Sequence, residues 1–211
     1  MQKKNFLDAN VELPNIPYLF DFRRLGFESA AFDFGCGNGR FTLAFAKENS
    51  KTVVVGCELF KEFCSKGSRK ATAEGISNAK FIQANGITVL EHLISNTSLD
   101  HLFINFPDPW HKKRHHKRRV FTPTFFKMCR KKLTEQGKIH FISDNREIYA
   151  FALENAQKTF LGKDGFAVTE KAIPDWFPRS KYHEKWSKMD RVITYFEVGR
   201  REETEKKAAT A

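Results

Sequence analysis

Apolar and polar positions along this chain follow two periods, and these periods predict most of its helices and strands. Short runs rich in Val, Ile and Phe, bounded by polar or glycine-containing turns, are typical of buried strands. Such runs fall at Ala30–Phe34, Thr52–Cys57, Lys80–Ala84, Leu99–Asn105, Lys138–Ile142, Phe166–Lys171 and Val192–Val198. Segments with apolar residues three and four positions apart predict helices between them. These segments are Arg40–Asn49, Phe60–Glu74, Val89–Ile94, Thr122–Leu133 and Asn145–Phe160.

The alternation of strands with helices predicts an α/β fold: a mostly parallel, doubly wound sheet with helices on both faces. A chain of 211 residues is long enough for one such domain with a full core and too short for two. We expect a lead-in over residues 1–28, a single domain over 29–198 and a charged, disordered tail over 199–211. The first residues lack the apolar run of a signal peptide, and no segment approaches the length of a membrane span. We therefore expect a cytoplasmic protein without a membrane partner.

Positive charge is concentrated in one stretch of the chain. There are 36 Lys and Arg against 25 Asp and Glu, which gives a net charge of +11. Six of these cations lie within the run His111–Arg119: Lys112, Lys113, Arg114, Lys117, Arg118 and Arg119. Charge concentrated in this way fits a polyanionic partner such as a nucleic acid better than a general solubility device.

The four cysteines do not indicate a metal site or a disulfide framework. They are Cys36, Cys57, Cys64 and Cys129, and no pair has the Cys-x-x-Cys spacing of a zinc site. We expect reduced thiols and no bound metal.

The turn after the first predicted strand is rich in glycine and reads Asp33-Phe-Gly35-Cys-Gly37-Asn-Gly39. Glycines here let the backbone turn tightly and approach a ligand at the carboxyl edge of a parallel sheet. The spacing is G-x-G-x-G and not the G-x-G-x-x-G that binds a dinucleotide pyrophosphate. It therefore favours a nucleoside cofactor without a pyrophosphate, such as S-adenosylmethionine, over a purely structural turn.

Polar residues also follow the next two predicted strands. Glu58 closes the second strand, where a carboxylate can accept hydrogen bonds from both ribose hydroxyls. Asn85 follows the third strand, where its side chain could meet the adenine amino group of such a cofactor. Since Gly86 comes next, an ordinary Asn-Gly turn is an equally good interpretation.

The fourth predicted strand leads into Asn105-Phe-Pro-Asp108-Pro-Trp110, with the basic run directly behind it. Two prolines fix the backbone on either side of Asp108, at the edge where cofactor and substrate should meet. The plainer interpretation of Asp108 is a solvated turn residue, and Trp110 could stack on a base or anchor the core. Asp144 ends the fifth strand at the same edge, where it could bind a ligand or cap the helix that follows.

Together these motifs resemble the bacterial tRNA (guanine-N7)-methyltransferases. The resemblance runs from about Phe32 to Val198, and its most specific part is the Asp-Pro-Trp sequence with the basic run behind it. It implies the Rossmann-like fold of class I methyltransferases. It also implies transfer of a methyl group from S-adenosylmethionine to guanine 46 in the variable loop of tRNA, and it leaves open whether the protein is a monomer or a homodimer.

The resemblance implies roles for individual positions. Asp108 matches the catalytic residue of the family. Cofactor contacts are expected from Asp33, Gly35, Gly37, Glu58 and Asn85. Substrate contacts are expected from Lys112, Asp144, Ser180, Tyr182 and His183, and contacts to the RNA backbone from Lys113, Arg114, Lys117, Arg118 and Arg119. The chain departs from the family pattern at three positions: Asn85 stands for Asp, Ser180 for Thr and His183 for Glu.

Three alternatives stay open from the residues alone. A methyltransferase acting on another RNA base, such as one that modifies an exocyclic adenine nitrogen, would carry Asn/Asp-Pro-Pro-aromatic after the fourth strand, and Phe106 and Asp108 interrupt that pattern. A catalytically impaired RNA-binding module with the same fold is allowed by His183. A nicotinamide oxidoreductase is disfavoured by the glycine spacing and by the basic run.

Overall fold

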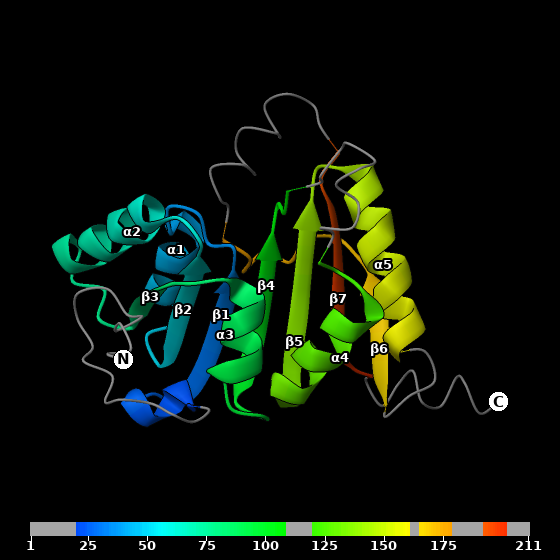
Figure 1. The fold of residues 1–211 in the computed structure, drawn as a ribbon, viewed down its shortest axis with the longest axis horizontal. Helices are drawn as coiled ribbons and strands as arrows, with labels where there is room; N and C mark the ends of the chain where they lie inside the picture. The colour runs from blue at the N-terminus through cyan, green and yellow to red at the C-terminus, as the bar shows by residue number, and fades with distance from the viewer. Residues whose placement is uncertain (1–19, 109–119, 161–164, 179–191, 202–211) are drawn as a thin grey trace, which may run out of the picture.

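The structure is a computed structural model, and it describes residues 20–108, 120–160, 165–178 and 192–201. Within these residues one seven-stranded sheet has helices on both faces (Figure 1). The strands are β1 (Ser29–Phe34), β2 (Thr52–Glu58), β3 (Ala79–Gln83), β4 (Leu99–Asn105), β5 (Leu133–Ser143), β6 (Phe166–Glu170) and β7 (Thr194–Arg200). The helices are the 3-10 helix η1 (Phe22–Leu25), α1 (Arg40–Glu48), α2 (Lys61–Ala73), α3 (Gly86–His92), α4 (Pro123–Lys132) and α5 (Arg146–Phe160).

The strand order is β3-β2-β1-β4-β5-β7-β6. Strands β1 to β5 are parallel, whereas β7 runs antiparallel to both β5 and β6. The start of β7 therefore lies beside the end of β5, where Thr194 pairs with Ser143. This arrangement confirms the predicted Rossmann-like, mostly parallel fold, in which ligands bind at the carboxyl edge of the sheet.

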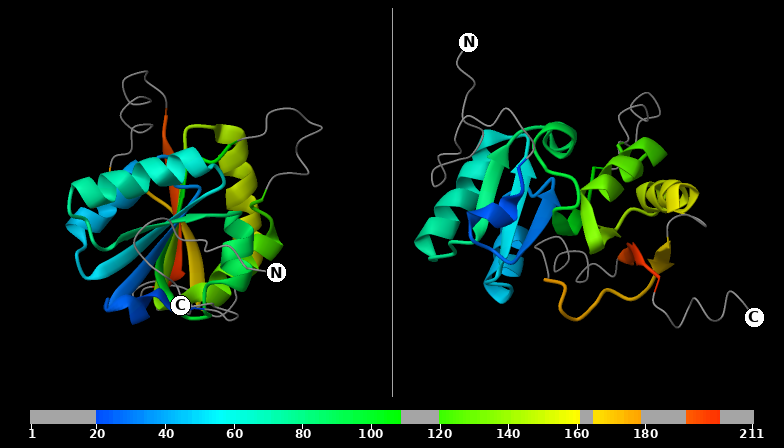
Figure 2. Two further views of the ribbon diagram at one scale, coloured as in Figure 1. Left: turned by 60° about the vertical axis from the view of Figure 1, so that its left-hand side comes forward. Right: turned by 90° about the horizontal axis from the view of Figure 1, so that it is seen from below.

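Side chains of the central strands alternate between two cores, one on each face of the sheet. In β1, Phe32 belongs to the core beneath α3, α4 and α5, while Ala31 belongs to the core beneath α1 and α2. The second core also contains Phe177 from the segment 171–178, which has no helix or strand. Figure 2 (right) shows this orange segment on the face opposite α4 and α5. No helix in the described part of the chain is long and apolar enough to cross a membrane.

The structure confirms most predicted elements within one or two residues and corrects two of them. Helix α3 begins at Gly86 and not at Val89, because Asn85 caps it by accepting from the backbone N–H of Ile87 at 2.9 Å. Strand β5 begins at Leu133 and not at Lys138, since the chain passes directly from α4 into the strand.

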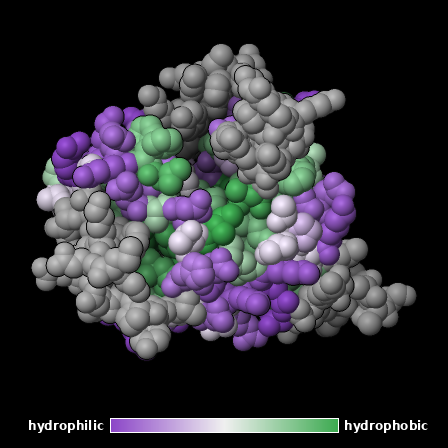
Figure 3. Space-filling model, in the orientation of Figure 1, coloured by the Kyte–Doolittle hydropathy of each residue, from purple (hydrophilic) through white to green (hydrophobic). Residues whose placement is uncertain are grey.

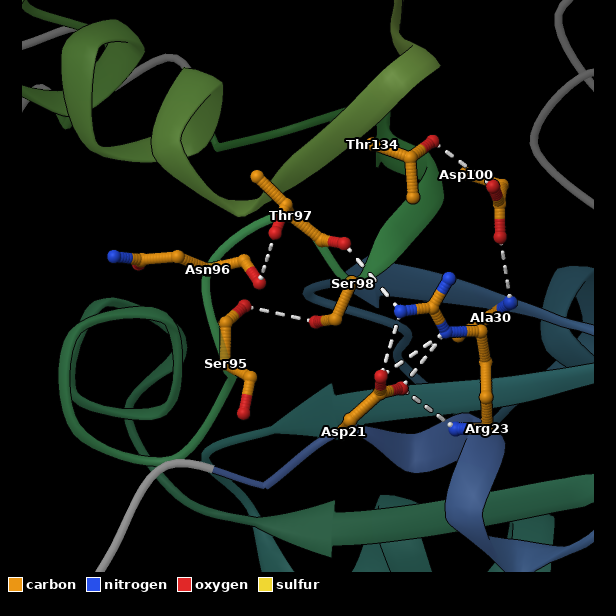
Figure 4. Close-up of polar contacts among 9 residues, drawn as sticks. All are labelled: Asp21, Arg23, Ala30, Ser95, Asn96, Thr97, Ser98, Asp100 and Thr134. Carbon is orange, nitrogen blue, oxygen red and sulfur yellow. Dashed lines mark hydrogen bonds and ion pairs between the residues drawn. The ribbon is translucent and has the colours of Figure 1, made fainter.

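The amino edge of the sheet is held together by a group of carboxylates (Figure 4). Asp21 caps η1 and pairs with the guanidinium of Arg23, whose Nη2 also lies 3.4 Å from the carbonyl oxygen of Thr97. Asp100 accepts from the backbone at the start of β1 at 3.0 Å and from the Thr134 hydroxyl of β5 at 2.9 Å. These contacts fix the edge opposite to the one on which the predicted site residues lie.

Candidate functional site

Asp33 is the central residue at the carboxyl edge of the sheet. Its side chain is fully buried at the end of β1. The Thr42 hydroxyl donates to one carboxylate oxygen at 2.7 Å, and the Asn105 amide donates to the other at 3.2 Å. Burial raises the pKa of Asp33 to about 6, the two hydrogen bonds oppose the rise, and the charge of Glu58 adds to it. The protein thus holds a carboxylate in a fixed orientation in a site that partly resists its ionisation.

The glycine turn after β1 leaves open space beside Asp33. Gly35 and Gly37 have φ angles of 76° and 52°, a left-handed conformation that favours glycine. A Cβ at either position would have nothing within 4 Å, so the turn presents bare backbone to its surroundings. Gly39 is different, because a Cβ there would lie 2.5 Å from the ring of Phe81. We conclude that the first two glycines allow a ligand to approach and that the third allows close packing.

Glu58 faces this turn from the end of β2. Its Oε2 accepts from the backbone N–H of Gly37 at 3.1 Å, and its Oε1 accepts from that of Leu59 at 2.7 Å. Oε1 also accepts from the backbone N–H of Phe60 at 3.4 Å, so Oε2 is the oxygen that keeps a lone pair with which it can accept from a ligand. The side chain is therefore oriented by the backbone, at the position for which the sequence predicts contacts to ribose hydroxyls.

The end of β4 has two unusual features. The Asn105 Oδ1 atom is buried and has no hydrogen-bond partner among the described residues, although the Nδ2 atom of the same amide donates to Asp33. Phe106 has a φ of 48°, which is rare for a residue with a side chain, and its N–H donates to the carbonyl of Ile142 at 2.9 Å. Such a conformation costs roughly 1–3 kcal/mol and persists only where surrounding contacts impose it. Here it turns the chain so that Asp108 emerges exposed at the edge.

The remaining described site residues lie at the same edge. Asp144 is half-buried and follows β5 directly. The capping role considered for this stretch belongs to Asn145, whose Oδ1 accepts from the N–H of Ile148 at 3.0 Å. Asn85 is exposed at the end of β3, where it caps α3. The structure thus brings Asp33 into contact with Asn105 and Glu58 into contact with Gly37, and the charge of Glu58 acts on Asp33.

Eleven predicted positions, including Trp110, lie outside the described residues. They are Trp110, Lys112, Lys113, Arg114, Lys117, Arg118, Arg119, Ser180, Tyr182 and His183, together with Pro109 beside Asp108. Their roles stay predictions.

Sequence reasoning missed the two donors to Asp33. Asn105 was recognised only as part of the motif after the fourth strand, and Thr42 was one polar residue in a predicted amphipathic helix. The positions of Thr42 and Asn105 in the sequence could have indicated that both lie near Asp33. Thr42 lies in the first turn of the helix that follows the glycines, and Asn105 ends the strand beside β1.

A chain of buried polar groups, which was not apparent from the sequence, crosses the face of the sheet that α1 and α2 partly cover. Burial opposes ionisation of Glu197, but the ammonium groups of Lys138 at 2.9 Å and Lys171 at 3.1 Å more than offset this and lower the pKa of Glu197. The carboxylate is therefore charged and accepts from the Tyr195 hydroxyl at 3.2 Å.

The direction of this hydrogen bond fixes the protons further along the chain of polar groups. Because the Tyr195 hydroxyl donates to the carboxylate, it accepts from Nδ1 of His140 at 2.8 Å. Burial lowers the pKa of His140 well below its usual range, so the ring is neutral and its Nε2 accepts. The donor to Nε2 is Nδ1 of His101 at 3.0 Å. These bonds join β4, β5 and β7 and contribute to the rigidity of the sheet behind the site.

Comparison with solved structures supports the fold described above. The aminoglycoside resistance methyltransferase NpmB1 is similar with a TM-score of 0.57 and 19% sequence identity, covering 87% of this chain and 94% of that chain. The 16S rRNA methyltransferase KamB is similar with a TM-score of 0.59 and 14% identity, covering 84% and 89%. At these identities the likeness establishes the fold, which is the Rossmann-like fold of class I methyltransferases.

Sequence comparison gives the family. A family model described as "Putative methyltransferase" matches residues 28–196. The tRNA (guanine-N(7)-)-methyltransferase of Thermus thermophilus is 32% identical over 161 residues, which are 76% of this chain and 50% of that protein. The protein of the same name from Streptococcus pneumoniae is 30% identical over 76% of both chains. The chain belongs to the tRNA (guanine-N7)-methyltransferase family. It spans about half the length of the relatives from Thermus thermophilus and Aquifex aeolicus.

Proposed function

We propose that this protein transfers a methyl group from S-adenosylmethionine to N7 of a guanine in tRNA, at position 46 of the variable loop. Membership of the family supports the reaction class. The observation that carries the proposal is the group of acceptors at one edge of the sheet. Asp33 is buried and held by Thr42 and Asn105 beside an open glycine turn, and β4 delivers Asp108 to the same edge.

The residues at this edge fit S-adenosylmethionine. The carboxylate of Asp33 and the buried Oδ1 of Asn105 are acceptors for the ammonium group of the methionine part. The carboxylate of Glu58 is positioned to accept from the ribose hydroxyls, and the bare backbone at Gly35 and Gly37 leaves room for the ligand between them. When bound, the cofactor supplies a methyl group on a positively charged sulfur. The Oδ1 of Asn85 accepts from the N–H groups of Ile87 and Thr88, so Asn85 would donate from Nδ2 to a ring nitrogen of the adenine and would not accept from its amino group.

The chemistry requires positioning more than proton transfer. Guanine N7 carries an in-plane lone pair, so no proton has to be removed before N7 attacks the methyl carbon and the bond from that carbon to sulfur breaks. Alignment of the two reactants can lower the barrier by roughly 7–11 kcal/mol at best. Asp108 and Asp144 would accept hydrogen bonds from N1–H and the N2 amino group of the base, which orients it and balances the positive charge that develops on the ring.

The predicted residues beyond the described part complete the proposal. Lys112, Ser180, Tyr182 and His183 would contact the target nucleotide. The rest of the basic run, Lys113, Arg114, Lys117, Arg118 and Arg119, would bind the tRNA backbone, which makes binding steeply dependent on salt. Residues 29–198 would form the catalytic domain, preceded by a lead-in and followed by a charged tail. Because its substrate is tRNA, we place the activity in the cytoplasm.

The decisive experiment is incubation with unmodified tRNA and a labelled methyl donor, followed by mapping of the modified nucleotide. Label on N7 of guanine 46, absent when that guanine is replaced in the transcript, is the expected result. Label on another base would replace the proposal by the alternative of a different RNA methyltransferase. If both ligands bind and no label is transferred, the protein is an impaired module, and His183→Glu should then restore transfer.

A variant tests the proposed role of Asp108. Asp108→Asn should reduce methyl transfer by two orders of magnitude or more, because an amide cannot accept from both guanine donors. Its affinity for S-adenosylmethionine, measured by calorimetry, should stay within a few-fold of that of the unaltered protein. Transfer at the original rate would remove Asp108 from the mechanism.

A further inference from the structure

Two large aromatic side chains stand exposed beside the proposed cofactor site. Phe60 precedes α2 and Phe63 lies in its first turn, and their exposed fractions are 59% and 40%. The rings form an edge-to-face pair with centroids 6.1 Å apart. Leu59, directly before them, is 58% exposed. We call Phe60 and Phe63 the aromatic ledge. In Figure 3 a small green patch stands among purple, hydrophilic surface at this corner of the molecule, next to α2.

The fold does not account for the ledge. Helix α2 packs on the sheet through its small buried residues, which are Cys64, Gly67, Ser68 and Ala71. Phe60 occupies the N-cap position and makes no side-chain capping bond, although Ser, Thr, Asp and Asn stabilise a helix best at this position. Phe60 and Phe63 belong to neither of the two cores. Two aromatic rings at solvent-facing positions contribute little to the stability of the folded state. Contact with a ligand is therefore the better explanation for them.

Three cations lie near the ledge on α2, together with one exposed carboxylate, that of Glu62. Lys61, Lys66 and Arg69 are exposed on α2, and none of them forms an ion pair with any residue in the described part of the chain. The Lys66 ammonium lies 5.9 Å from the centre of the Phe63 ring. Aromatic rings with cations beside them are the surface that binds unpaired nucleotides, because bases stack on the rings and phosphates pair with the cations. The charge therefore argues for RNA over an apolar protein partner.

The ledge is continuous with the proposed site. The Glu58 carboxylate that faces the glycine turn also accepts from the backbone N–H groups of Leu59 and Phe60, at 2.7 and 3.4 Å. A nucleotide on the ledge would therefore lie next to the ribose end of the bound cofactor. Strand β4, which leads to Asp108, lies on the other side of β1 from β2 and the ledge.

We propose that the aromatic ledge, with Lys61, Lys66 and Arg69, is a second tRNA-binding surface that stacks an unpaired nucleotide of the substrate near the target guanine. This inference rests on the proposed function, since it takes tRNA as the substrate. It adds contacts from α2 to the RNA contacts that the sequence predicts for the basic run.

Binding of unmodified tRNA, measured without methyl transfer, tests the ledge. The variant Phe60→Leu/Phe63→Leu keeps apolar side chains and removes both rings. It should raise Kd for tRNA by about 5-fold or more for each base that no longer stacks. The matched control Phe60→Tyr/Phe63→Tyr keeps the rings and should bind tRNA with the original affinity. Kd for S-adenosylmethionine should stay within about 3-fold in both variants, because the bonds to Glu58 come from backbone N–H groups.

The cations are tested by the salt dependence of the same binding. Lys66→Gln/Arg69→Gln should reduce the slope of log Kd against log salt concentration by about 0.7 for each phosphate that the variant no longer neutralises. Lys51→Gln is the control. Lys51 is exposed at the start of β2, at the opposite edge of the sheet, and pairs with Glu28, so this variant should leave the slope unchanged.

Each other outcome has a separate meaning. Unchanged tRNA affinity in the leucine variant would overturn the inference that the ledge binds tRNA and would leave the proposed function intact. A loss confined to S-adenosylmethionine affinity also overturns it and assigns the rings to the cofactor site. A dimer that dissociates in the leucine variant while tRNA affinity is kept makes the ledge a subunit interface. If the unaltered protein binds tRNA and transfers no methyl group, the proposed function fails, and the variants still decide the ledge.

Discussion

Replacing Asp33 with Asn should make the protein more stable at pH 8 while weakening cofactor binding. Burial raises the pKa of Asp33 from 3.8 to about 6, so at pH 8 the folded protein carries a charge that its surroundings disfavour. This difference in pKa corresponds to about 3 kcal/mol, which is the largest increase in the free energy of unfolding that removal of the charge can give.

The hydrogen bonds of the site should survive the change. The introduced side chain keeps an oxygen that can accept from the Thr42 hydroxyl, and its NH2 group would face Asn105. The amide of Asn105 can turn over and present Oδ1, which is buried and without a hydrogen-bond partner in the described part of the chain. We therefore expect a net gain of about 1–3 kcal/mol in the free energy of unfolding at pH 8.

The effect of pH gives the sharper test. Since the carboxyl pKa is higher in the folded state than in the unfolded state, the folded protein binds the proton more tightly between pH 4 and 6. The loss of stability that the charged Asp33 causes is therefore complete above pH 6. It declines as the pH falls from about 6 to 4 and is absent below pH 4. The stability difference between Asp33→Asn and the unaltered protein should decline in the same window.

Urea denaturation at pH 8 and at pH 4 measures this difference directly, and the melting temperature at pH 8 should rise by about 2–4 °C per kcal/mol gained. Glu28→Gln is a control, because this exposed carboxylate pairs only with Lys51 among the described residues and should change stability by less than about 1 kcal/mol at either pH. A stability difference that is equal at both pH values, or a loss of stability at pH 8, would refute the reasoning.

Cofactor affinity should show the reverse dependence. Binding of an ammonium group needs the charged form of Asp33, so Kd for S-adenosylmethionine should rise about tenfold for each pH unit below 6. The Asp33→Asn variant should bind weakly at every pH. Calorimetric titration between pH 5 and 8 measures both. A constant affinity in the unaltered protein would mean that Asp33 does not bind the cofactor.

Three further variants test the turn and the buried polar groups. Gly39→Ala should lower the free energy of unfolding by about 3 kcal/mol or more. The new Cβ would clash with Phe81, and the backbone at this position is left-handed. Gly35→Ala, also left-handed but with open space, should cost less stability and instead weaken cofactor binding, and equal stability losses would contradict this division. Tyr195→Phe removes the hydroxyl to which His140 donates, and should cost about 1–3 kcal/mol in urea denaturation without changing cofactor affinity. Unchanged stability would mean that the buried ring finds another acceptor.

The sequence predicted elements well wherever one strong pattern decided the structure. The apolar run Leu99–Asn105 became β4 with the predicted bounds. The start of β5 was wrong because the stretch 134–137 is polar and ends in glycine, which is typical of a turn. In the structure it forms a register irregularity within the strand, and Gly137 is needed because a Cβ there would lie 2.5 Å from the carbonyl oxygen of Leu99.

The site could be placed from the sequence but not its internal contacts. Asp33, Glu58 and Asp108 follow strands, so their common edge could be predicted from topology alone. That Thr42 and Asn105 donate to Asp33 depends on the register of β1 with β4 and on the turn before α1. The buried His140 and the half-buried His101 were missed for a similar reason. A polar residue within a strand indicates exposure unless its partner on the neighbouring strand is known, and His101 and His140 are each other's partners.

The reversal of β7 changes how this sheet can supply residues to its active edge. Each of the parallel strands β1 to β5 can place there only the residues that come after its own carboxyl end. Strand β7 begins at that edge, where the Thr194 hydroxyl donates to the carbonyl of Ser143 at 3.0 Å, so it places there the residues that precede it. Chain length before Thr194 can therefore vary without moving any strand. Under the proposed function, an insertion at that point would change the contacts to the substrate and leave the proposed methyl-donor site unchanged.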